Sequence, residues 1–137
     1  MRDGHPVDFL AVMVEGPPEP SIAAAMRAVT ADLAGRRTWT LGPPRLLDGP
    51  SPRIELAIYS ARPPWGAELD PDVDRAHLDE VKELFRAFGP ISADHRCSLE
   101  VELGGETIGF IESGVLDSML ADSLLAEWER HLDRPER

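Results

Sequence analysis

Apolar side chains fall on both faces of the segment Val7–Val14, with Phe9, Ala11 and Met13 alternating with Leu10, Val12 and Val14. A strand that other elements cover on both sides has this pattern, so we predict a central strand of a sheet. Apolar positions then change to helical spacing over residues 22–34, which predicts an amphipathic helix whose buried stripe is Ile22, Met26, Val29 and Leu33.

Prolines and glycines divide the middle of the chain. Thr38–Leu41 and Arg45–Leu47 are interpreted as one strand interrupted by Gly-Pro-Pro, and the prolines favour an edge position. Arg53–Tyr59 alternates cleanly and predicts a further strand. A long loop is expected over residues 61–73, and a second amphipathic helix over Asp74–Phe88, ended by Gly-Pro at 89 and 90.

A hairpin is predicted after the second helix. Apolar and polar residues alternate from Ser98 to Leu103, and two glycines at 104 and 105 supply a two-residue turn. The turn predicts a register in which Val101 is opposite Ile108 and Leu99 is opposite Phe110, with Glu100, Glu102 and Thr107 on the other face.

A last helix is expected to begin near Asp117, a residue type that favours helix N-caps. Its apolar stripe is Leu120, Leu124, Trp128 and Leu132, widened by Met119 and Leu125. A stripe this wide needs a surface to cover, so we expect the helix, rather than a second subunit, to lie on the second face of the sheet.

Together the segments predict a single α+β domain over residues 1–137, in the order β-α-β-β-α-β-β-α. The first six elements match the ferredoxin-like (split βαβ) topology, to which a C-terminal strand and helix are added. The match is to a topology and names no family. A chain of 137 residues can bury enough apolar surface to fold independently.

The charge is concentrated in the second half of the chain. The net charge is −11; residues 1–67 hold seven acids and seven bases, whereas residues 68–137 hold eighteen acids and seven bases. Residues 97–129 contain eight acids and no Lys or Arg. Such a surface repels phosphate backbones and anionic lipids, so nucleic acid and membranes are excluded as partners. With one cysteine, no visible leader and no long apolar run, we expect a cytoplasmic protein.

No motif in the sequence identifies a reaction. Cys97 and His95 lie two residues apart, too far along a strand for a nucleophile–base pair, and no third or fourth metal ligand is suitably spaced. The acidic segment Asp70–Asp74 resembles the start of a calcium loop, but Arg75 and Val81 occupy the positions that need Gly and Glu. We therefore predict no catalytic residues, no metal and no cofactor, and lean away from an enzyme.

The acidic segment 97–129 carries our functional hypothesis. A concentrated acidic surface speeds association with a basic protein and adds specificity, as in inhibitor or immunity-type proteins. The candidate partner-binding residues are Glu100, Glu102, Glu106, Asp122 and Glu129. The alternative is a small-ligand protein or small enzyme with a pocket near the 61–73 loop, lined by Trp39, Tyr59 and Trp65. A monomer and a homodimer both fit the sequence.

Overall fold

The computed structural model describes residues 7–16, 19–47, 52–59 and 70–133. The turn expected at 48–52 and the loop expected at 61–73, with Trp65, lie wholly or largely outside this part of the chain. The described residues form a mixed α+β structure with one six-stranded antiparallel sheet, in the strand order β2-β3-β1-β4-β5-β6. No helix within these ranges is long and apolar enough to cross a membrane.

The central strand is β1, Val7–Val14, which pairs with β3 (Arg53–Tyr59) on one side and β4 (Ser98–Leu103) on the other. The short edge strand β2, Arg45–Leu47, pairs with β3. The central position of β1 and the edge position of β2 are as predicted. The prediction that residues 38–41 also form a strand was wrong: they form a turn, in which Trp39 is buried.

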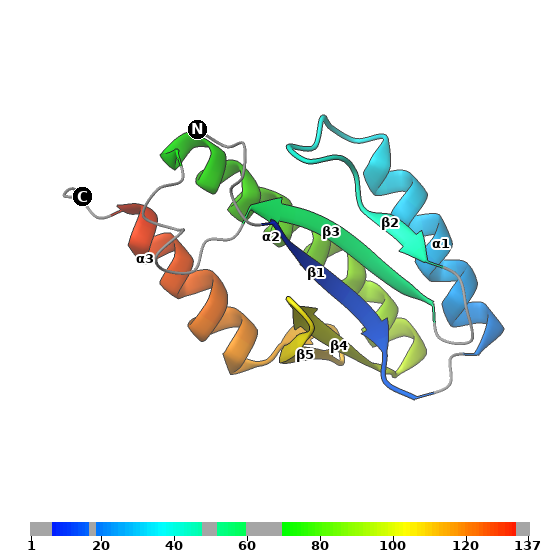
Figure 1. Ribbon diagram of the computed structural model, residues 1–137. Coiled ribbons are helices and arrows are strands. Elements are labelled where there is room, and N and C mark those ends of the chain that lie inside the picture. The colour runs from blue at the N-terminus through cyan, green and yellow to red at the C-terminus, as the bar shows by residue number, and fades with distance from the viewer. Residues whose placement is uncertain (1–6, 17–18, 48–51, 60–69, 134–137) are drawn as a thin grey trace.

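Two long helices, α1 (Pro20–Ala34) and α2 (Pro71–His95), lie together on one face of the sheet (Figure 1). The prediction that α2 ends at Gly89-Pro90 was wrong, because the helix continues to its cap at Arg96. Gly89 is buried inside α2, where an added Cβ would lie 3.4 Å from the carbonyl oxygen of Gly114. This glycine therefore permits close packing against a neighbouring turn, and does not end the helix.

The hairpin of β4 and β5 (Glu106–Glu112) turns at the two predicted glycines, but its predicted register was wrong. A β-bulge between Val101 and Glu102 shifts the pairing, so that Val101 is opposite Gly109 and Leu99 is opposite Ile111. The extra residue of a bulge moves the following side chains to the other face. Ile111 therefore joins the core in place of Phe110, and a two-residue strand, β6 (Val115–Leu116), completes this edge.

The C-terminal helix begins as a π-helix, η2 (Met119–Ala126), and continues as α3 (Glu127–Asp133). As predicted, Asp117 caps its start: the Asp117 carboxylate accepts a hydrogen bond from the Leu120 amide at 3.0 Å. Leu120 and Trp128 are buried, whereas Met119 is 49% exposed and does not widen the buried stripe as expected.

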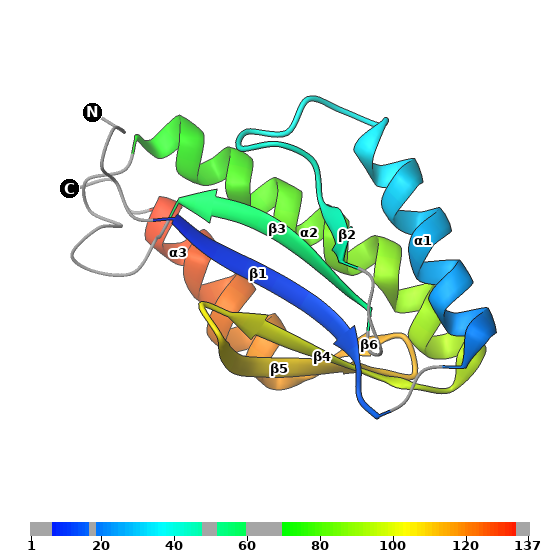
Figure 2. The same cartoon turned by 45° about the vertical axis from the view of Figure 1, so that its right-hand side comes forward.

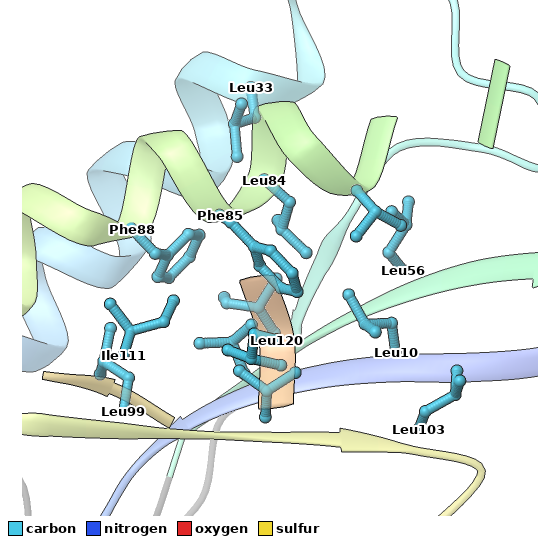
Figure 3. Packing of buried hydrophobic residues seen from close by; sticks show 14 of the residues in the cluster. Leu10, Leu33, Leu56, Leu84, Phe85, Phe88, Leu99, Leu103, Ile111 and Leu120 are labelled. Atoms are coloured by element: carbon cyan, nitrogen blue, oxygen red, sulfur yellow. The ribbon is translucent and has the colours of Figure 1, made fainter. Parts of the chain in front are cut away.

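This last helix does not cover the second face of the sheet, which corrects our expectation. Leu120 packs among Leu10, Phe85 and Phe88, between the sheet and α2 (Figure 3). All the described helices lie on the same side of the sheet (Figure 2). The buried face of α2 is wide, because this helix contacts both α1 and α3. The described helices leave the opposite face of the sheet, here called the open face, without a helical layer.

Candidate functional site

The open face is centred on the outward side chains of β1. Phe9 is 46% exposed there, while its neighbours Leu10 and Val12, which point to the helices, are fully buried. Met13 is half-buried on the same outward side. Large apolar side chains on an exposed sheet face are a feature of protein-binding surfaces, because binding removes them from water.

Charged side chains flank this apolar centre on both sides. Arg53 on β3 lies 3.3 Å from a carboxylate oxygen of Glu55 and 3.3 Å from one of Glu102, which belongs to β4. Ala11 of β1 is paired with both Glu55 and Glu102, so the ion pair reaches over this alanine. That arrangement explains why Ala11 is 1% exposed although none of the described helices covers it.

The β4–β5 hairpin adds further carboxylates to the open face. Glu100, paired with Phe110, accepts a hydrogen bond from the Thr107 hydroxyl. Ser98 donates to Glu112 at 3.1 Å. These bonds hold the carboxylates along the strands without neutralising them, so this end of the open face keeps its negative charge.

The five predicted partner-binding acids do not come together on one surface. Glu100 and Glu102 lie on the open face, and Glu106 is exposed at the start of β5, next to the turn. Asp122 and Glu129 belong to the C-terminal helix, in the helical layer on the other side of the sheet (Figure 2). The acidic segment is continuous in sequence, but the turn after β6 carries its second half to the opposite side.

Glu129 is also engaged within the fold. Its carboxylate accepts a hydrogen bond from Lys82 Nζ at 2.6 Å, which ties α3 to α2. A carboxylate that already holds a cation attracts a basic partner less strongly. Glu102 likewise holds a cation, Arg53, whereas Glu100 accepts a hydrogen bond from the neutral Thr107 hydroxyl; both acids lie on the open face of the sheet.

The aromatic residues of the alternative hypothesis contact different partners. Trp39 is buried, donates from Nε1 to the Leu33 carbonyl at 3.1 Å, and lies beneath the guanidinium of Arg37. It therefore serves as a core residue at the end of α1. Tyr59, at the end of β3, is half-buried and contacts His77 edge-on with a centroid distance of 5.7 Å. Trp65 lies outside the described residues.

A buried polar network, which the sequence analysis missed, lies behind Tyr59. His77 Nε2 accepts a hydrogen bond from the Tyr59 amide at 3.2 Å, and Nδ1 is 3.4 Å from Glu80 Oε1. The other Glu80 oxygen accepts bonds from the amide and hydroxyl of Thr40, at 2.9 and 2.8 Å. With both ring nitrogens used, His77 joins α2 to the sheet and has no position left for a substrate.

Glu80 is held as a carboxylate by this network. Burial alone raises the pKa of Glu80, but hydrogen bonds from His77 and from Thr40 outweigh it, and the pKa lies below the ordinary value. Burial raises the pKa of the Cys97 thiol, so the thiolate that a nucleophile needs is disfavoured. In the described part of the chain, no group of three or more His, Cys, Asp or Glu side chains is arranged to hold a metal ion.

The site so defined belongs to an α+β domain whose sheet has one face covered by helices and one face open. Comparison of the chain with protein-family models, with curated proteins and with solved structures gives no match. The proposals below therefore rest on the geometry and charge of this chain alone.

Proposed function

We propose that this protein is a non-enzymatic interaction module that binds a basic protein on the open face of its sheet. One observation carries the proposal: the outward row of Phe9, Ala11 and Met13 on β1 has the half-buried carboxylates of Glu55, Glu100 and Glu102 beside Ala11 and Met13, with Arg53 between Glu55 and Glu102. An apolar centre with a charged border is the usual anatomy of a protein interface.

Charge complementarity favours a basic partner over a second copy of the chain. The net charge of −11 opposes self-association, since like-charged molecules repel. Two open faces in contact would also bring the glutamates of β4 close together. A basic partner instead gains from the carboxylates during approach and from Phe9 and Met13 in the docked complex.

Two finer proposals concern the topology of the fold and the location of the protein. Strand order β4-β1-β3-β2 with antiparallel neighbours, and helices between β1 and β2 and between β3 and β4, support a ferredoxin-like core. A part-buried free thiol at Cys97 agrees with a reducing compartment, and we retain the cytoplasm as the expected location.

Matched charge reversals test the function. Tagged wild-type protein is incubated with native lysate at low salt, and a captured basic protein is then purified and titrated against each variant. We expect Glu100→Lys/Glu102→Lys to weaken this complex at least about tenfold, through lost attraction and added repulsion. The control, Asp122→Lys/Glu129→Lys, makes the same charge change on the helical side and also breaks one ion pair, between Lys82 and Glu129.

Three results contradict the proposal. One is capture of no basic protein at low salt; another is equal loss of binding in both double variants, which indicates an effect of net charge alone. The third is a dimer in sedimentation that Glu100→Lys/Glu102→Lys dissociates, which assigns the open face to self-association. Circular dichroism and urea unfolding of both variants distinguish lost binding from lost folding.

A further inference from the structure

A cavity of about 730 Å³, widely open to solvent, lies on the helical side of the protein, away from the open face. It is bounded by α2, by the turn at Ser113 and Gly114, by β6 and by the π-helix η2. Its volume is within the range of small-molecule sites, about 300–1,000 Å³. The cavity differs in place from the pocket that the sequence analysis expected near the 61–73 loop.

Close packing of small residues fixes one wall of the cavity. The Gly114 amide donates to the Ser92 hydroxyl at 2.9 Å, and an added Cβ at Gly114 would lie 3.1 Å from the Cβ of Ala93. Ser113, directly before it, has a left-handed φ of 53°, which is unfavourable for a residue with a side chain. The turn is thus held against α2 in a conformation that the local sequence alone does not favour.

The opposite wall belongs to the π-helix. Leu125 of η2, Leu116 of β6 and the buried Phe85 of α2 all line the cavity. A π-helical turn is wider than an α-helical turn, and such turns recur at functional sites. The interior of the cavity therefore includes aromatic and aliphatic side chains beside polar ones.

Two cations of α2 border this interior. Lys82 and Arg86 are four residues apart and so lie on the same side of the helix. Lys82 is paired with Glu129, which compensates its charge. Arg86 is exposed, and none of the described residues gives it a hydrogen bond or an ion pair. One uncompensated guanidinium therefore lies beside an apolar cavity in a strongly acidic protein.

We propose that this cavity binds a small monocarboxylic acid with an apolar body. A guanidinium presents a planar pair of donors that fits both oxygens of a carboxylate. One uncompensated positive charge matches a monoanion better than a phosphate dianion. The hydrocarbon part of the acid would replace water against Phe85, Leu116 and Leu125.

Chemical-shift titration of the full chain tests the proposal, with decanoate as the probe. Decylamine and decanol carry the same tail with a cationic and a neutral head group. We expect decanoate to shift the amide signals of Gly89 and Gly114 with saturable behaviour, and decylamine to leave them unchanged. Arg86→Gln is expected to weaken decanoate binding about tenfold, because a charge-assisted pair is lost.

Two further variants make the result decisive. Arg36→Gln removes another exposed arginine, which pairs with Asp32 on α1 and does not line the cavity, and should leave decanoate affinity unchanged. Ala93→Leu adds side-chain volume at the border of the cavity and should abolish binding, with circular dichroism to check that the fold is kept. Absence of saturable shifts, equal binding of decylamine, or unchanged affinity in Arg86→Gln would each overturn the proposal. None of these outcomes depends on the open face.

Discussion

Arg53 and Glu102 form an ion pair that reaches across the central strand, with 3.3 Å between Arg53 Nη2 and Glu102 Oε1. Their strands, β3 and β4, are separated by β1, and the side chains meet above Ala11. Arg53 also lies 3.3 Å from Glu55, so one cation serves two carboxylates. The pair acts as a partial cover for the sheet face that the helices of the described ranges leave open.

Replacing Arg53 with Ala should lower the free energy of unfolding by about 1 kcal/mol, because it leaves two half-buried carboxylates without a cation and exposes Ala11. Urea unfolding at neutral pH measures the change. Arg75→Ala is the control, because its pair with Asp133 is well exposed, at 50% and 68%, and should contribute less than about 0.5 kcal/mol. Equal losses in the two variants would show that the pair over Ala11 has no special role.

Phe9 and Leu10 are adjacent on β1, but truncating them should change the free energy of unfolding by very different amounts. Phe9→Ser removes a side chain that is 46% exposed and should change unfolding free energy by less than about 1 kcal/mol. Leu10→Ala removes a fully buried side chain and should cost about 2–5 kcal/mol. Urea unfolding compares them. A large loss in Phe9→Ser would mean that the open face is part of the folding core.

Gly109 should tolerate no side chain. Its φ is 156°, and an added Cβ would lie 2.6 Å from Leu120 Cγ and 2.7 Å from a carboxylate oxygen of Asp117. Gly109→Ala should therefore destabilise the protein by about 2 kcal/mol or more, since both neighbours are held by the helix start. Gly35→Ala is the control, because φ there is −91° and the nearest atom is 3.9 Å away. Thermal unfolding that ranks the two equally would contradict this packing.

Local pattern was sufficient to predict the strands with clear alternation and the helices with a clear stripe. Arg53–Tyr59 has the predicted bounds, and Asp117 caps the last helix. These features depend on residues close together in sequence. The bulge beside Val101 places Gly109 opposite this residue, and the missing side chain of Gly109 admits Leu120 from a helix that lies later in the chain.

The composition of each surface could not be predicted from local sequence pattern, because it depends on contacts between residues far apart in the chain. Residues 97–129 form one acidic run, yet Glu100 and Glu129 lie on opposite sides of the sheet, because the last helix packs beside α2. Gly89-Pro90 resembles a helix end, but α2 continues past it, and Gly89 packs against Gly114 from a distant turn. His77 and Glu80 show helical spacing, but their partners Tyr59 and Thr40 come from elsewhere in the chain.

Glu80 should make stability depend on pH in the acid range. Its pKa in the folded protein is lowered, so the carboxylate contributes stability above the ordinary pKa of 4.5, and this stability is lost as pH falls through the folded value. The difference in unfolding free energy between wild type and Glu80→Gln should be largest at neutral pH and shrink below pH 4.5. Urea titrations at several pH values measure it. A difference that grows on acidification would reverse the assigned sign.

The hydrogen bond between Trp128 and Asp74 should help to hold the C-terminal helix against α2. Trp128 Nε1 donates to Asp74 Oδ1 at 2.7 Å, and both side chains are buried. Trp128→Phe keeps an aromatic ring but leaves the carboxylate without this donor, so the free energy of unfolding should fall by about 2–3 kcal/mol. Asp74→Asn retains an acceptor for the indole and should cost less. Urea unfolding ranks the two variants, and hydrogen exchange over residues 119–133 tests whether the loss begins with undocking of this helix. Unchanged exchange there in Trp128→Phe would show that apolar contacts alone hold the helix on α2.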